Sequence, residues 1–196
     1  MDQPVVQLRT PLTEEVVEGL KSGDRVHISG VLYVARDAAH MRMVAALSRG
    51  QALPFDPRDQ TIYYMGPTPA RPGKPIGSAG PTTAGRMDAY TVPLLKAGLR
   101  GMIGKGSRSL AIRRAMIEYK AVYFAATGGA AALIARSIRR ARVIAYADLG
   151  TEALRRLEVV QLPAVVINDV HGGDLYEEAR ERYGKPKSER HAVDCA

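Results

Sequence analysis

The sequence predicts an α/β protein in which a mixed sheet is flanked by helices. Apolar runs rich in β-branched residues alternate with helical runs through the second half of the chain, and this alternation is typical of parallel or mixed sheets. The run AVYFAA, residues 121–126, is apolar throughout, as expected for a strand that is buried on both faces. With 196 residues, of which 46% are hydrophobic, the chain can form one domain with its own core.

The first half of the chain carries clear helix and strand signals. Thr13 precedes Glu14 and Glu15, so a hydroxyl and two carboxylates stand where a helix N-terminus favours them. Gly23 is expected to end this helix, and Gly30 predicts a turn or bulge within the next strand. The elements expected beyond the first helix are a strand over 25–35, a helix over 37–48, a polar loop over 51–60 and a short strand over 61–65.

The second half begins with a segment, 66–85, that is dense in glycine and proline. Because its prolines stiffen it, we interpret it as an ordered functional loop rather than a linker. The elements expected beyond it are helices over 87–97, 107–118, 130–139 and 174–183, strands over 100–103, 121–126 and 164–167, and a helix or strand over 151–160. We expect one domain over 1–184 and a basic, flexible tail over 185–196.

The formal net charge is +8. Such a balance favours an anionic partner, which could be a nucleic acid, an acidic metabolite or an acidic protein. An alternative is that an arginine-rich and alanine-rich composition reflects genomic bias. The basic residues are scattered over helical segments and do not form one long tail.

Cys195 is the single cysteine. With one cysteine the chain cannot form an internal disulfide. For the same reason this chain alone cannot ligate an iron–sulfur cluster through several thiolates. The N-terminus has no apolar segment typical of a signal peptide, and no apolar run approaches the length of a membrane span. We therefore expect a soluble, cytoplasmic protein.

The motif GMIGKGSRS, residues 101–109, follows a short predicted strand and leads into a helix, a place where free backbone N–H groups can bind anions. Its spacing fits neither the phosphate-binding loop nor the dinucleotide fingerprint. What remains is Lys105, presented on a glycine-flanked turn. The alternative is an ordinary strand-to-helix turn with a solvated lysine.

Arg36 ends an apolar strand, and ligands of α/β sheets collect at strand ends. Its guanidinium could hold a carboxylate through two parallel hydrogen bonds. The alternative is that Arg36 only pairs with Asp37 or a helix C-terminus. His40, four residues further on, is interpreted as structural rather than as a metal ligand.

The stretch GPTTAGRMDAY, residues 80–90, combines tight backbone, two hydroxyls and a cation. If a helix begins near Thr83, then Arg86 lies on its first turn and faces the same pocket as Thr82. The alternative is that Thr82 or Thr83 simply caps this helix, and spacing alone favours the cap.

These positions share one chemistry. Arg36, Arg86 and Lys105 are three cations on strand ends or glycine-rich turns, and they suit a small dicarboxylate. Gly128 and Gly129 open another predicted helix and could add backbone donors, although close packing explains these glycines equally well.

GPTTAGRMD, with RDAAH upstream and KGSRS downstream, resembles the C-terminal, or beta, region of class I fumarate hydratases and L-tartrate dehydratases. The resemblance continues through YFAATGGAAALIARSI and YADLGTEALRRLEVVQLPAVVINDVHGGDLY, so it covers nearly the whole chain. It implies a swivelling β/β/α domain that closes over the substrate.

The resemblance also implies roles for single residues. Arg36, Arg86 and Lys105 would bind the dicarboxylate and Thr82 would be the catalytic base. Thr83, Gly128 and Gly129 are accessory candidates on the basis of the residues themselves. A [4Fe-4S] cluster, held by three cysteines of an N-terminal or alpha region, would act as the Lewis acid. No metal ligand is expected in this chain, which would be a beta subunit that forms a heterotetramer with the cluster-bearing alpha subunit and is inactive alone.

The leading hypothesis is therefore a subunit of a hydro-lyase that reversibly hydrates fumarate to L-malate. The nearest alternative is a subunit of L(+)-tartrate dehydratase, which would use the same cations. An alternative of another class is a non-catalytic anion- or RNA-binding domain on the same fold. The chain lacks the basic face interleaved with aromatic residues that base stacking requires.

Overall fold

The computed structural model describes residues 4–184. It confirms the predicted mixed α/β fold, with one seven-stranded sheet flanked by helices. The predicted tail over 185–196, including Cys195, lies outside the described residues.

The strands are β1 (Val6–Arg9), β2 (Arg25–Val34), β3 (Thr61–Tyr63), β4 (Gly101–Gly104), β5 (Val122–Ala125), β6 (Ile138–Ala145) and β7 (Leu154–Asn168). The α-helices are α1 (Glu14–Glu18), α2 (Asp37–Ser48), α3 (Asp88–Lys96), α4 (Leu110–Glu118), α5 (Ala131–Ala135) and α6 (Leu175–Tyr183). Two 3-10 helices, η1 (Ala84–Met87) and η2 (Ala147–Glu152), complete the described elements.

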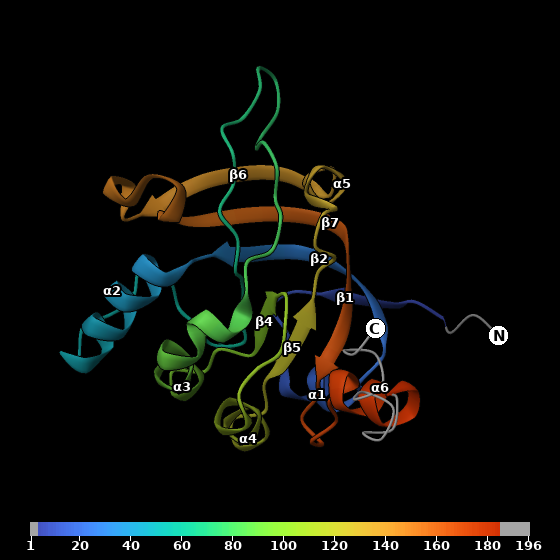
Figure 1. The fold of residues 1–196 in the computed structure, drawn as a ribbon. Helices are drawn as coiled ribbons and strands as arrows, with labels where there is room; N and C mark the ends of the chain where they lie inside the picture. Colours follow the sequence, from blue (N-terminus) through green and yellow to red (C-terminus); the bar gives the residue numbers. More distant parts are fainter. Residues whose placement is uncertain (1–3, 185–196) are drawn as a thin grey trace, which may run out of the picture.

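The strand order is β1-β2-β3-β4-β5-β7-β6, with an additional pairing between β2 and β7. Strands β1 to β5 run parallel to one another, whereas β7 runs antiparallel to β2, β5 and β6. The pairings of β2, β3, β4, β5 and β7 therefore close a ring. Figure 1 shows the long strands β2, β7 and β6 as one layer, with α3 and α4 on the other side of β4 and β5.

The core consists of two apolar clusters on the two faces of the sheet. On β5, Val122 and Phe124 belong to one cluster and Tyr123 to the other. The strand is thus buried on both faces, which explains why AVYFAA is apolar without alternation. The second cluster includes Met43 of α2 and Leu94 of α3, so these helices are fixed against the strands that precede them.

Local signals predicted some boundaries well. The Thr13 hydroxyl accepts a hydrogen bond from the Val16 N–H at the start of α1, although α1 ends at Glu18 and not near Gly23. The register between β2 and β7 shifts between Ile28 and Gly30, which confirms the bulge predicted at Gly30.

Other expectations were wrong in segments whose secondary structure is determined by pairing with another strand. The helix expected over 130–139 is the short α5, and Ile138 already begins β6, where it pairs with Val159. Alanine-rich helical propensity yields here to tertiary pairing. Strand β7 extends over 15 residues, so the ambiguous 151–160 and the strand expected over 164–167 are mostly one element. Strand β1 was not expected at all.

Residues 66–80, which we call the arm, leave the body after β3 and return before η1. Figure 1 shows the arm rising beyond β6. A turn at its tip is closed by the hydrogen bond from the Lys74 N–H to the Arg71 carbonyl, 3.0 Å long. At its base, the Ala79 N–H donates to the Ala131 carbonyl, and the Tyr63 hydroxyl donates to the Ala79 carbonyl. The arm is thus anchored where it meets the body.

The bulge generates a stability prediction. Gly30 has a φ of +118°, and a Cβ there would lie 2.5 Å from the Thr10 hydroxyl oxygen. Gly50 also has a positive φ, +67°, but a Cβ there would meet nothing within 4 Å. We expect Gly50→Ala to cost about 1 kcal/mol of unfolding free energy and Gly30→Ala to cost about 3 kcal/mol or more. Urea denaturation measures both, and equal losses would contradict the steric explanation.

Candidate active site

Thr82 and Lys105 lie on two segments that pair through their backbones. The Lys105 N–H donates to the Thr82 carbonyl at 3.0 Å, and the Ala84 N–H donates to the Lys105 carbonyl at 2.8 Å. The Thr82 N–H donates to the Tyr64 carbonyl at 2.7 Å. These bonds form a parallel bridge in which Lys105, just beyond β4, pairs with Thr83, so Thr82 is next to the residue that lies opposite Lys105.

The threonines do not act as helix caps. Thr83 precedes η1, but its side chain makes no capping hydrogen bond. Helix α3 begins only at Asp88. Thr82 is half-buried and Thr83 is exposed, and within residues 4–184 neither hydroxyl forms a hydrogen bond. Thr83 therefore stands at the N-cap position of η1, as spacing alone favoured, but it does not cap the helix through its side chain, and the Thr82 hydroxyl is available for another role.

The two arginines of the candidate site are joined through the start of α2. Arg86 forms an ion pair with Asp37, with its Nη2 2.9 Å from Oδ2. Arg36, directly before Asp37, has its Nη2 3.5 Å from Oε1 of Glu152. The other oxygen of Glu152 accepts the Ala38 N–H at 2.9 Å. Both guanidinium groups are thus held in place by carboxylates of the same chain.

Arg36 also lies against the first residue of the arm. A Cβ at Gly66 would overlap the Arg36 guanidinium. Glycine at this position therefore makes room for the arginine side chain, a contact between distant residues that no local sequence pattern indicates.

Lys105 is exposed, and within the described residues its ammonium group has no ionic partner. A Cβ at Gly128 would lie 3.8 Å from Cδ of Lys105, so the turn before α5 reaches this lysine. Gly128 and Gly129 are both exposed, and Gly129 has a φ of +82°. The structure thus brings Lys105 close to Thr83 and Gly128, with Thr82 joined to Lys105 through the backbone. It also brings Arg86 together with the segment that carries Arg36.

Arg108, in the same KGSRS motif, is a residue that the sequence interpretation missed. Its side chain is buried. Nε donates to Asp88 at 2.7 Å, Nη2 to the Thr91 hydroxyl at 2.6 Å and Nη1 to the Tyr64 hydroxyl at 3.3 Å. Arg108 therefore ties α3 to Tyr64, whose carbonyl accepts the Thr82 N–H. A separation of 20 residues from Asp88 leaves no sequence signal for this pair.

His40 supports the backbone of Arg36. The ring is fully buried, and Nδ1 lies 2.8 Å from the Arg36 carbonyl oxygen, so Nδ1 carries the proton and donates. Nε2 is buried and has no hydrogen-bond partner within the described part of the chain. Burial lowers the pKa of His40 to about 4, although the Arg36 carbonyl opposes this shift. The neutral ring thus fits the structural role predicted for it.

Two further features bear on cofactors and membranes. Among residues 4–184, no group of three or more His, Cys, Asp or Glu side chains is arranged to hold a metal ion. No helix in the same range combines the length and the apolar character needed to cross a membrane.

Residues 1–179 match the family described as Fumarase C-terminus. The chain belongs to this family. Fumarate hydratase 1, mitochondrial, of Leishmania major is 38% identical over 179 residues, which cover 89% of this chain and 32% of that protein. The anaerobic class I fumarate hydratase of Escherichia coli K12 is 35% identical over 181 residues, which cover 91% of this chain and 32% of that protein.

This chain therefore spans about a third of the length of these two relatives. A relative of a different length comes from Methanocaldococcus jannaschii and is assigned as an L(+)-tartrate dehydratase subunit beta. It is 36% identical over 177 residues, which cover 87% of this chain and 91% of that protein.

The buried guanidinium of Arg108 leads to a prediction about stability. Arg108→Met would leave the Asp88 carboxylate without its cation, so we expect a loss of about 3–5 kcal/mol of unfolding free energy. Arg58→Met, which breaks the exposed pair with Asp56, should change stability little. Chemical denaturation compares the two variants. Similar stabilities would contradict the bracing role of Arg108.

His40 generates a prediction of pH dependence. Its pKa of about 4 in the folded chain lies below the ordinary 6.5, so the unfolded chain binds more protons between these values. This group therefore stabilises the fold fully above about pH 6.5, and the stabilisation is lost as the pH falls towards 4, by about 3 kcal/mol. His40→Asn should flatten this part of the profile, measured by urea denaturation at several pH values. His171→Asn, at an exposed ring, is the control, and an unchanged profile in His40→Asn would refute the assignment.

Proposed function

We propose that this chain is the beta part of a hydro-lyase that reversibly hydrates fumarate to L-malate. The observation that carries the proposal is the backbone pairing of the Thr82 turn with Lys105, combined with the ion pair that joins Arg86 to the start of α2. Thr82 and Lys105 follow the carboxyl ends of parallel strands, and Arg36 follows the end of β2, where ligands of such sheets bind; we propose that Arg86 completes the same site. The membership in the Fumarase C-terminus family supports the same reading.

Arg36, Arg86 and Lys105 would bind the two carboxylates of the substrate. A guanidinium matches a carboxylate with two parallel hydrogen bonds, whereas an ammonium group acts as a point charge. The pairing of Arg36 with Glu152 and of Arg86 with Asp37 orients both guanidinium groups before the substrate arrives. Little reorganisation would then be needed on binding.

Thr82 would exchange the proton on the carbon next to a carboxylate. Removing this proton places a second negative charge on that carboxylate, and fixed cations stabilise the charge as it develops. A threonine hydroxyl is a weak base in water, so the role requires a site that excludes water and contains cations. The half-buried position of Thr82 beside Lys105 is consistent with this requirement.

The proposed reaction also needs a group that this chain does not hold. Class I fumarate hydratases are iron–sulfur enzymes, and residues 4–184 offer no cluster of metal ligands. Because the chain has one cysteine and a cluster needs several thiolates, we propose that an alpha subunit holds the [4Fe-4S] cluster, which would supply a Lewis acid for the substrate hydroxyl. This chain would supply the cations and the hydroxyl, in a heterotetramer located in the cytoplasm.

A second candidate is the beta part of L(+)-tartrate dehydratase. It is favoured by the relative from Methanocaldococcus jannaschii, which is matched over 91% of its length and is assigned as such a subunit. The same three cations would bind tartrate, which is also a dicarboxylate. Turnover of malate and of tartrate by the reconstituted complex distinguishes the two candidates.

The test requires the chain together with a cluster-bearing alpha subunit, reconstituted without oxygen. We expect Thr82→Val to lower kcat for fumarate formation from malate by about 100-fold or more, because the proton acceptor is removed. Thr151→Val, at an exposed threonine of η2, should keep the parental rate. Absorbance of fumarate and copurification of the two subunits are measured together. Full activity of Thr82→Val in an intact complex would disprove the base assignment.

A further inference from the structure

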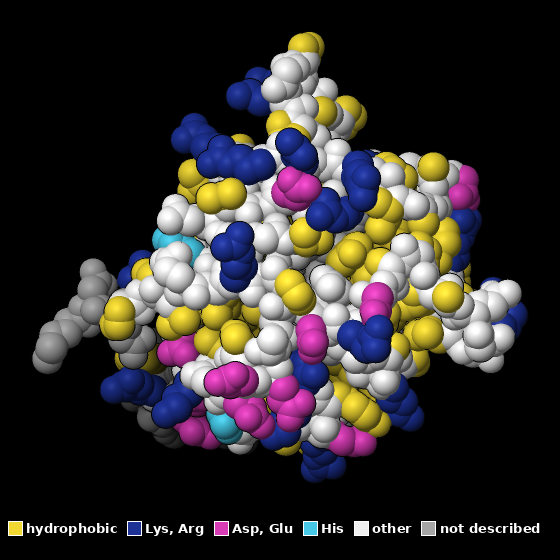
Figure 2. Space-filling model, turned by 180° about the vertical axis from the view of Figure 1, so that it is seen from behind, with side chains coloured by type: hydrophobic (Ala, Val, Ile, Leu, Met, Phe, Trp, Pro, Cys, Tyr) yellow, Lys and Arg dark blue, Asp and Glu magenta, His cyan; other side chains and the backbone are white. Residues whose placement is uncertain are grey.

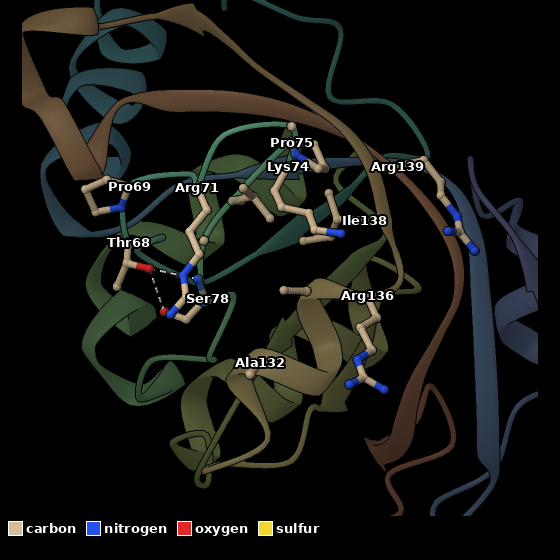
Figure 3. A pocket seen from close by; sticks show the side chains of 14 residues that line it. Thr68, Pro69, Arg71, Lys74, Pro75, Ser78, Ala132, Arg136, Ile138 and Arg139 are labelled. Atoms are coloured by element: carbon tan, nitrogen blue, oxygen red, sulfur yellow. Dashed lines mark hydrogen bonds between the residues drawn. The ribbon is translucent and has the colours of Figure 1, made fainter.

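A second basic region lies away from the candidate active site, between the arm and the α5–β6 segment. It forms a groove of about 850 Å³, which we call the arm groove (Figure 3). Its cations are Arg71 and Lys74 of the arm and Arg136 and Arg139 of the facing segment. None of the residues predicted for the active site lines it.

The four cations of the arm groove lack carboxylate partners. All four side chains belong to exposed residues, none forms an ion pair within the described residues, and no Asp or Glu lines the groove. Many other arginines of the chain are paired, as Arg42 is with Asp148. Figure 2 shows Lys and Arg side chains gathered around the base of the arm with one acidic side chain among them, whereas most Asp and Glu side chains lie below. A bound anion would therefore meet positive charges that no carboxylate of the groove lining neutralises.

The groove also has a preformed apolar floor. Ile76 and Ile138 are buried beneath the cations. The Thr68 hydroxyl accepts hydrogen bonds from the Ser78 N–H at 2.8 Å and from the Ser78 hydroxyl at 3.1 Å, which joins the two sides of the arm. A Cβ at Gly77 would lie 2.5 Å from the Pro69 carbonyl, so the two sides are closely packed. The volume lies within the range of small-molecule sites, about 300–1,000 Å³.

We propose that the arm groove binds a compact organic polyanion that carries two or more phosphate or carboxylate groups. The cations would hold the anionic groups, and the apolar floor would contact the body of the ligand. The cations come from both sides of the groove, so one ligand would link the arm to α5 and β6. The inference does not rest on the proposed hydro-lyase function.

The position of the groove connects it to the candidate active site. The first residue of the arm, Gly66, lies against Arg36, and the arm returns at Pro81, which pairs with Met65 just before Thr82. A ligand that fixes the arm to the body would therefore restrict the chain at both ends of the arm, at Gly66 next to Arg36 and at Pro81 next to Thr82.

The experiment uses the purified full chain and isothermal titration calorimetry at low ionic strength, with pyrophosphate, ATP and citrate as probes. We expect saturable binding of at least one probe, weakened by added salt. Lys74→Ala combined with Arg136→Ala should weaken it by about tenfold or more, because two charge-assisted contacts are lost. Lys96→Ala combined with Arg114→Ala removes the same charge at exposed sites away from the groove and should bind as the parent does.

The outcomes separate the ligand sources and the two sites. Binding of pyrophosphate and ATP alone would assign phosphate groups, and binding of citrate alone would assign carboxylates. Arg86→Ala should retain binding, which separates the groove from the active site. The proposal fails if no probe saturates, if the Lys74/Arg136 variant binds as tightly as its control, or if only single-stranded RNA binds. None of these results depends on turnover or on an alpha subunit.

Discussion

The antiparallel pairing of β2 with β7 is the constraint on which the candidate site depends. Its register places Val34, at the end of β2, opposite Arg155, near the start of β7. Arg36 follows β2 by two residues and Glu152 precedes β7 by two, so both lie at the same edge and form their ion pair. A shift of one residue would turn every side chain of β2 to the opposite face. The same pairing closes the ring, which brings the ends of β3 and β4 to this edge.

The elements that could be predicted are those whose signal lies within the element itself. AVYFAA indicates a doubly buried strand, and Gly30 and Thr13 indicate a bulge and a helix start through their own chemistry. Strand β1 was not predicted because only Leu8 of its four residues is buried. The beginning of β6 was not predicted because its IRR sequence follows an alanine-rich helix and becomes a strand only by pairing with β7. Pairing between distant segments is not visible in local propensity.

The candidate site shows the same division. The glycines that flank Lys105 are visible in the local sequence, although the structure places Lys105 in a backbone bridge with Thr83 rather than on a free turn. The partners that orient the site are not visible there, because Asp37 meets Arg86 across 49 residues. At such partly exposed positions an ion pair adds little stability. The ion pair instead fixes the orientation of the guanidinium, so that a substrate carboxylate would meet cations that are already oriented.

The pairing of the cations bears on the two explanations of the basic composition. Several exposed cations, among them Arg9, Lys96 and Arg114, lie outside the arm groove and form no ion pair within the described residues, as a bias in composition alone would produce. Such a bias does not explain why the four cations of the arm groove have no Asp or Glu in the lining beside them. Arg108, by contrast, is buried and engaged by three side-chain partners. The local absence of carboxylates at the groove, rather than the net charge of +8, therefore supports an anionic ligand there.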